Sequence, residues 1–177
     1  MLAHAGEDSV ITAAWAVVAT VPDPEVPALT LCDLGVVREV RAQPEHGAQA
    51  LDVVLTPTYS GCPATEVIAQ SVREALESAG FTPVHVTLQR APAWTTDWMS
   101  EDGKRKLREY GIAPPGPVQR PDGAVPVRWL PRQHERVPCP RCDSPRTERL
   151  SAFGSTACKA LYRCLACQEP FEHFKPI

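Results

Sequence analysis

A pair of Cys-x2-Cys motifs near the end of the chain places the strongest constraint on its fold. Cys139-Pro-Arg-Cys142 and Cys164-Leu-Ala-Cys167 are separated by 21 residues. Each motif can form a knuckle that directs two thiolates at one ion, and two facing knuckles give the closed tetrahedral site of structural zinc. Residues 139–177 are too few to form an apolar core without such a staple. The sequence therefore predicts a four-cysteine zinc ribbon over 139–177.

Other states of these four cysteines fit the same spacing. The thiols could be free or joined in disulfides, or they could hold iron, because a tetrahedral thiolate site suits iron as well as zinc. We favour zinc because the first residues do not resemble a secretion signal, and a cytoplasmic compartment keeps thiols reduced. The uncharged stretch from Ser9 to Pro22 is shorter than the roughly 18 residues of a membrane span. We therefore expect a cytoplasmic protein with no membrane contact.

Charge and proline divide the chain into modules. Residues 1–112 carry 8 Lys and Arg against 15 Asp and Glu, whereas residues 113–177 carry 10 against 6. Seven prolines fall between 113 and 138, which is typical of a semi-stiff linker. We expect a first domain over 8–112, a Pro-rich linker over 113–138 and the ribbon over 139–177. The basic excess of the last module is a thin electrostatic footprint, so we expect no nucleic-acid partner.

The apolar periodicity of the first domain predicts an α+β fold, a small three-stranded sheet packed with helices. Val10, Ala14 and Val18 belong to a helical stripe that ends before Pro22, and Ile11 and Trp15 beside it predict a largely buried helix. The remaining elements follow the order β-β-α-β-α. They are strands 36–41 and 51–55 joined as a hairpin by a turn at 44–49, helix 63–79, strand 84–88 and helix 100–110, opened by Ser100.

Cys62 lies in the motif Gly61-Cys62-Pro63, at the predicted start of the second helix. Pro63 fits the first helical position, which would place Cys62 at the N-cap, where unpaired N–H groups and the helix dipole favour a thiolate. Such a thiolate could bind iron or an iron–sulfur cluster, or attack an electrophile. Cys62 could equally be a small residue that fits a tight turn. The sequence places no His or second Cys close to it, which argues against hydrolytic chemistry.

Three further features keep alternative interpretations. Cys158 could be a spare ligand or a transfer thiol, but a buried thiol is the more common state, and Cys32 is expected to lie in the core. His173 is expected to be a surface or packing residue, since four sulfurs already satisfy the ion. Asp23 and Glu25, in Asp23-Pro-Glu25, could cap a turn or provide carboxylates.

Several of these motifs resemble known families. Asp23-Pro-Glu25, Asp33-Leu-Gly35 and the segment 56–63 are similar to the small iron–sulfur carrier and assembly family that includes SufT, over about residues 8–112. The runs Trp94-Thr-Thr-Asp-Trp-Met-Ser100 and Phe153-Gly-Ser-Thr-Ala-Cys-Lys-Ala-Leu-Tyr-Arg-Cys164, with the two knuckles, resemble the PaaD family, the accessory proteins of the bacterial phenylacetyl-CoA epoxidase system. This second resemblance spans nearly the whole chain.

The resemblance implies a role in aerobic phenylacetate degradation, in which a diiron oxygenase works with a flavin and iron–sulfur reductase. It implies that Cys62 is the functional thiol, that Asp23 and Glu25 are the acidic pair of the family motif, and that the four knuckle cysteines hold zinc. One departure is the run Thr58-Tyr-Ser60 before Gly61, where many carriers have a proline next to the glycine. That difference changes the stiffness of the loop.

Three functions follow from this evidence. The first is a non-enzymatic maturation factor, in which Cys62 transiently holds iron or an iron–sulfur cluster for an epoxidase component, chiefly the reductase, and in which a homodimer could share the cluster. The second is a non-catalytic structural subunit of the epoxidase complex, with Cys62 as a turn residue. The third is a zinc-ribbon nucleic-acid binder, which the weak charge excess of residues 113–177 disfavours.

Overall fold

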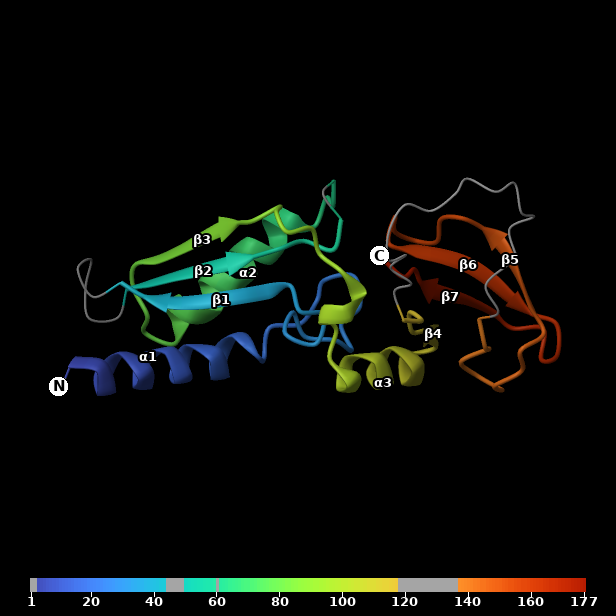
Figure 1. Cartoon of the computed structure of the whole chain (residues 1–177), viewed down its shortest axis with the longest axis horizontal. Helices are drawn as coiled ribbons and strands as arrows, with labels where there is room; N and C mark the ends of the chain where they lie inside the picture. Colours follow the sequence, from blue (N-terminus) through green and yellow to red (C-terminus); the bar gives the residue numbers. More distant parts are fainter. Residues whose placement is uncertain (1–2, 44–49, 60, 118–136) are drawn as a thin grey trace, which may run out of the picture. The chain divides into compact units, whose positions relative to one another are not determined.

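The computed structural model describes residues 3–43, 50–59, 61–117 and 137–177 (Figure 1). The chain divides into two compact units, Met1–Gly103 and Lys104–Ile177. Each has its own sheet, of three strands in the first unit and of four in the second. The predicted α+β class is confirmed.

The sheet of the first unit has the strand order β1-β2-β3. Strands β1 (Val37–Ala42) and β2 (Leu51–Leu55) are antiparallel, as the predicted hairpin requires. Strand β3 (Val84–Leu88) runs parallel to β2, because helix α2 (Thr65–Ser78) provides the crossover between them. The turn predicted over 44–49 lies outside the described residues.

Two helices cover one face of this sheet. Helix α1 (Ala3–Val18) contacts β1, α2 contacts β3, and the two helices contact each other. On α2, Ile68, Val72 and Leu76 form the buried stripe that the 3.6-residue period predicts. The prediction that the first helix is largely buried is wrong. Ala14 and Val18 are fully buried, but Ile11 and Trp15 are only half-buried, because α1 covers the edge strand β1 rather than the centre of the sheet.

The segment from Trp94 to Ser100 closes over the Asp33-Leu-Gly35 turn. It contains the short helix η2 (Thr96–Trp98), and the Trp94 indole donates a hydrogen bond to the Leu34 carbonyl oxygen over 2.9 Å. Gly35 has a φ of 66°, and a Cβ built on it would overlap the backbone of Trp98. A glycine is therefore required there by both conformation and space.

The second unit holds most of helix α3 (Glu101–Tyr110) and a sheet of order β4-β7-β6-β5. Its strands are β4 (Ile112–Ala113), β5 (Thr147–Ser151), β6 (Lys159–Cys164) and β7 (Pro170–Phe174). Its small core combines two of the knuckle cysteines with apolar side chains from both sides of the predicted linker. The members are Ala113, Val137, Cys139, Ala160, Tyr162, Cys164 and Phe171.

Residues Ile112 and Ala113 therefore pair with β7 in the second sheet. This pairing explains how so short a ribbon acquires apolar partners: it recruits α3 and β4 from earlier in the chain. The predicted domain limits stay a prediction, and residues 118–136 of the predicted linker lie outside the described residues.

Candidate functional site

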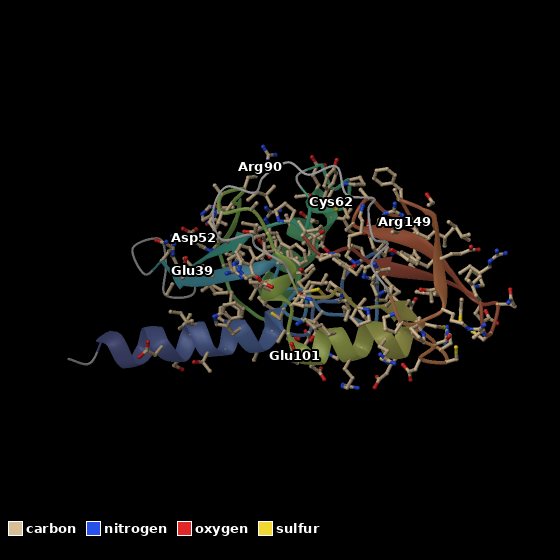
Figure 2. The ribbon with its side chains drawn as sticks, turned by 45° about the vertical axis from the view of Figure 1, so that its right-hand side comes forward. Glu39, Asp52, Cys62, Arg90, Glu101 and Arg149 are labelled. Atoms are coloured by element: carbon tan, nitrogen blue, oxygen red, sulfur yellow. The ribbon has the colours of Figure 1, made fainter. Side chains whose placement is uncertain are left out.

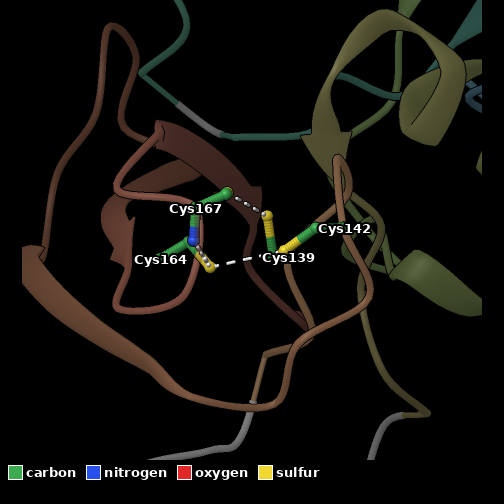
Figure 3. Close-up of side chains that lie close together, drawn as sticks. All are labelled: Cys139, Cys142, Cys164 and Cys167. Carbon is green, nitrogen blue, oxygen red and sulfur yellow. Dashed lines mark hydrogen bonds between the residues drawn. The ribbon is translucent and has the colours of Figure 1, made fainter.

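The four knuckle cysteines converge on one point of the second unit (Figure 3). The Sγ atoms of Cys139, Cys142, Cys164 and Cys167 all lie within 4.8 Å of one another, and no other group of three or more metal-ligating side chains occurs in the described parts of the chain. Cys139 Sγ lies 3.8 Å from Cys167 Sγ, and Cys142 Sγ lies 3.6 Å from Cys164 Sγ. A tetrahedral ion with metal–sulfur bonds of about 2.3 Å requires sulfur separations of about 3.8 Å.

Backbone N–H groups support the first cysteine of each knuckle. The Arg141 N–H donates to Cys139 Sγ over 3.4 Å, and the Ala166 N–H donates to Cys164 Sγ over 3.3 Å. The Cys167 N–H also donates to Cys164 Sγ, and these donors lower the pKa of Cys164 to about 6. Ionised sulfurs are the form that binds metal, so the loops are preorganised for a cation.

The two knuckles also end in the same way. Asp143, which follows Cys142, has a φ of 59°, and Gln168, which follows Cys167, has a φ of 65°. A left-handed residue at this position turns the chain away from the site and into the next strand. Helix α3 is tied to the first knuckle because Arg108 forms an ion pair with Asp143. The donor set, its spacing and its N–H groups therefore fit a closed zinc site.

Cys62 lies in the loop that joins β2 to α2. The carboxyl ends of parallel strands and the start of the crossover helix meet at such a loop, the place where open α/β units bind ligands. Figure 2 labels Cys62 among the side chains of the first unit. Its thiol is half-buried, its N–H donates to the Tyr59 carbonyl over 3.1 Å, and its own carbonyl accepts the Thr65 hydroxyl over 2.7 Å.

The predicted position of Cys62 at the helix N-cap is wrong. Helix α2 begins at Thr65, its N-cap is Ala64, and no side chain caps it. The reason is that the Cys62 carbonyl receives both the N–H and the hydroxyl of Thr65, so residues 62–65 form a turn ahead of the first helical residue. Cys62 is therefore held by a turn on each side, and the helix-dipole argument for its thiolate no longer applies to the cap position.

Thr56 is a residue of this loop that the sequence did not single out. It directly follows β2 and is 1% exposed, and its hydroxyl is the one buried side-chain oxygen or nitrogen without a hydrogen-bond partner in the described residues. Leaving a buried hydroxyl unpaired costs roughly 1–3 kcal/mol. No local sequence signal could have identified it, because the burial depends on strands β1 and β2 together: its N–H bonds the Val36 carbonyl.

The acidic pair has a structural role that the sequence left open. Asp23 Oδ1 accepts the N–H groups of Glu25 and Val26, over 3.0 and 2.7 Å, which closes the turn after α1. Asp23 is buried and Glu25 is half-buried. The structure does not bring Cys62, Asp23 and Glu25 together as a three-ligand group.

The remaining candidates are packing residues. Cys158 is buried, and its sulfur lies 3.0 Å from the Thr156 hydroxyl oxygen. His173 is buried against Tyr162 in an edge-on ring contact, and desolvation lowers its pKa to about 4. Cys32 is half-buried, and burial, with the nearby Asp33 carboxylate, raises the pKa of its thiol.

Known proteins match both units. Residues 11–88 match the family described as iron–sulfur cluster assembly protein, and residues 124–175 match the PaaD zinc beta ribbon domain. A protein of Escherichia coli strain K12, named for the 1,2-phenylacetyl-CoA epoxidase of which it is a subunit, is 52% identical over 163 residues, which cover 92% of this chain and 91% of that protein. The chain belongs to the PaaD family.

More distant relatives resemble the first unit of this PaaD-family chain. A Porphyromonas gingivalis protein named as an Fe-S protein maturation auxiliary factor is 37% identical over 90 residues, which cover 50% of this chain and 81% of that protein. The crystal structure of a DUF59 domain from Bacillus anthracis aligns with a TM-score of 0.54 and 24% identity, covering 59% of this chain and 96% of that one. That structure supports the fold of the first unit.

Both predicted resemblances, to the iron–sulfur assembly family and to the PaaD family, are therefore confirmed. The zinc ribbon assignment and the four-cysteine cluster together support zinc binding. Among the described helices, none has the length and apolar character needed to cross a membrane.

Proposed function

We propose that this protein is an accessory factor of the phenylacetyl-CoA epoxidase system that assists iron–sulfur cluster or iron insertion into an epoxidase component, most directly the flavin reductase. The iron–sulfur assembly domain over 11–88 and the Escherichia coli relative named for the epoxidase support the accessory role. The observation that carries the proposal is the single thiol, Cys62, held in the loop at the carboxyl ends of β2 and β3.

In this proposal Cys62 is a transient ligand. Its sulfur binds the incoming iron and releases the thiol proton, and the second thiol or carboxylate comes from the client, a donor protein or another copy of this chain. The half-buried position limits competing oxidation while it leaves the sulfur accessible. The buried, unpaired Thr56 hydroxyl lies in the same loop and is available to a bound group.

The zinc ribbon has a structural part in this proposal. One zinc ion held by Cys139, Cys142, Cys164 and Cys167 would fix the two knuckles and the strands between them. Because the site is closed by four sulfurs, the ion supplies folding energy and no open coordination position for chemistry. We propose that the protein acts in the cytoplasm and that it is not itself the oxygenase.

A second candidate is a structural subunit of the epoxidase complex. The Asp23 carboxylate favours it, because Asp23 accepts two N–H groups of its own turn, as an ordinary structural cap does. In that case Cys62 is also a turn residue, and its sulfur can be replaced by oxygen without effect.

One experiment separates the two candidates. The oxygenase and reductase are expressed with wild-type protein, with the Cys62→Ser variant and without the protein, and the iron and cluster content of each component is measured. The proposal expects a reductase depleted in cluster in both the variant and the empty strain. A full cluster in the Cys62→Ser strain would place the structural role first.

A further inference from the structure

The loop between β5 and β6, residues 152–158, has a construction that the proposed function does not use. It opens the motif that runs from Phe153 to Cys164. Beneath it, Lys159 Nζ lies 3.0 Å from Glu172 Oε2, and the Lys159 side chain is 3% exposed. A buried ion pair is seldom more stabilising than an apolar pair of similar volume, so its presence points to selection of one loop conformation.

The second oxygen of Glu172 fixes the loop itself. Glu172 Oε1 accepts the Ser155 N–H, and a Cβ built on Gly154 would overlap that oxygen. The Gly154 N–H donates to the Lys159 carbonyl over 2.8 Å, which closes the turn. Burial alone would raise the pKa of Glu172, but the Ser155 N–H and the Lys159 ammonium outweigh it and lower that pKa. The clamp is therefore ionised at neutral pH.

This rigid loop presents a large apolar side chain to solvent. Phe153 is 64% exposed, and the Lys175 ammonium lies 4.6 Å from the centre of its ring. Leu150, which is 50% exposed, occupies the register shift of β5 between Arg149 and Ser151, and a bulge of this kind re-aims a side chain. Three residues span at most about 11 Å, so Leu150 and Phe153 share one surface. We name Arg149, Leu150, Phe153 and Lys175 the Phe153 patch.

The charge around the patch is positive. Three acidic residues of the ribbon are already neutralised by ion pairs within the second unit: Asp143 with Arg108, Glu148 with Arg163, and Glu172 with Lys159. Arg149 on β5, labelled in Figure 2, and Arg146 just before it have no ion pair with any other described residue. An exposed aromatic ring beside unneutralised arginine is the typical composition of an interaction hot spot.

We infer that the Phe153 patch is the docking surface for a client protein, and that the client contributes an apolar side chain flanked by Asp or Glu. This inference rests on the proposed function, because it makes the client an epoxidase component. The apolar side chain would pack against Phe153 and Leu150, and the carboxylates would pair with Arg149 and Lys175. Loop and thiol then have separate tasks: the ribbon binds the client and the first unit handles the iron.

The test uses the zinc-loaded full chain and the purified oxygenase and reductase components, each immobilised in turn. Phe153→Ser and Arg149→Glu are expected to weaken binding to one component by about tenfold or more, as loss of a hot-spot residue does. Wild-type binding should also weaken as salt is raised. The matched controls are Leu165→Ser, at another exposed apolar residue, and Arg73→Glu on α2, which should bind like wild type. Zinc content and melting temperature show that each variant is folded.

The outcomes separate this inference from the proposed function. Wild-type affinity in both Phe153→Ser and Arg149→Glu, or no binding of the wild-type chain to either component, would overturn the docking surface. Cys62→Ser should bind the client as wild type does. If Cys62→Ser leaves the reductase with a full cluster while Phe153→Ser still abolishes binding, the maturation proposal fails and the docking surface stands.

Discussion

Ser100 and Asp33, 67 residues apart in sequence, bond each other through both backbone and side chain. The Ser100 N–H donates to the Asp33 carbonyl over 2.9 Å, and the Ser100 hydroxyl lies 3.3 Å from Asp33 Oδ1. The same hydroxyl accepts the Gly103 N–H over 2.9 Å and so caps α3. One serine therefore begins a helix and fixes the Asp33-Leu-Gly35 turn, which gives the two family motifs a shared structural purpose.

Replacing Ser100 should destabilise the first unit. Ser100→Ala removes a helix cap and a long-range hydrogen bond, which together contribute about 1–3 kcal/mol. Chemical denaturation followed by tryptophan fluorescence measures the loss. Ser78→Ala, at the exposed end of α2, is the matched control and should change stability by less than about 0.5 kcal/mol. Equal stabilities of the two variants would contradict the bridging role of Ser100.

Removal of zinc should unfold the ribbon and leave the first unit folded. Cys142→Ser, or a strong chelator, removes a ligand or the ion, and structural zinc in small modules supplies on the order of 10 kcal/mol of apparent folding free energy. Metal analysis of the purified protein is expected to give one zinc per chain. Amide hydrogen exchange should lose protection in β6 and β7 and retain it in β2. An iron–thiolate absorption band, or a chelated protein with a protected ribbon, would contradict this account.

Gln168→Gly should stabilise the second unit. Gln168 has a φ of 65°, where a residue with a Cβ is strained by roughly 1 kcal/mol and glycine is not. Asp143→Gly relieves a similar strain after the other knuckle but also removes the ion pair with Arg108. We therefore expect thermal unfolding of the ribbon to shift upward for Gln168→Gly and to shift less for Asp143→Gly. A lower melting temperature for Gln168→Gly would show that its side chain has an essential contact.

His173 should make the stability of the second unit depend on pH. Its pKa is lowered to about 4 by burial, so the unfolded chain binds a proton between its usual pKa of about 6.5 and that value while the folded chain does not. Stability is complete above about pH 6.5 and falls by up to about 3 kcal/mol as pH drops to about 4.

A variant isolates the histidine from other titrating groups. His173→Phe keeps an aromatic ring beside Tyr162 and removes the titration, so its unfolding free energy should vary less over this pH range than that of the wild type. Parallel pH profiles of the two proteins, measured with zinc in excess, would exclude His173 as the source.

Local sequence patterns predicted the elements that depend on local periodicity and spacing. The two Cys-x2-Cys motifs, the antiparallel pair β1 and β2 and the Ser100 helix start all have signals within a few residues. The missed features depend on distant partners. Thr56 is buried by packing that its neighbours in sequence do not reveal, and the start of α2 shifted because Thr65 bonds the Cys62 carbonyl. The ribbon recruited Ala113 through a strand pairing with β7 that no short motif encodes.

The iron or cluster ligands Cys62, Asp23 and Glu25 stay a prediction, as does the transient cluster itself. Asp23 illustrates why sequence was insufficient: a carboxylate near proline fits a ligand and a cap equally well, and only the three-dimensional turn shows the two N–H groups that it accepts. The thiol of Cys62 is where the two interpretations of this protein differ most.

The cluster content of the reductase in cells that carry Cys62→Ser tests the central claim most directly. Cys32→Ser is the matched control, since Cys32 is also half-buried in the first unit and burial raises the pKa of its thiol. The account predicts normal zinc content in both variants, a reductase short of iron–sulfur cluster only with Cys62→Ser, and no growth of that strain on phenylacetate. A full cluster and normal growth with Cys62→Ser would contradict it.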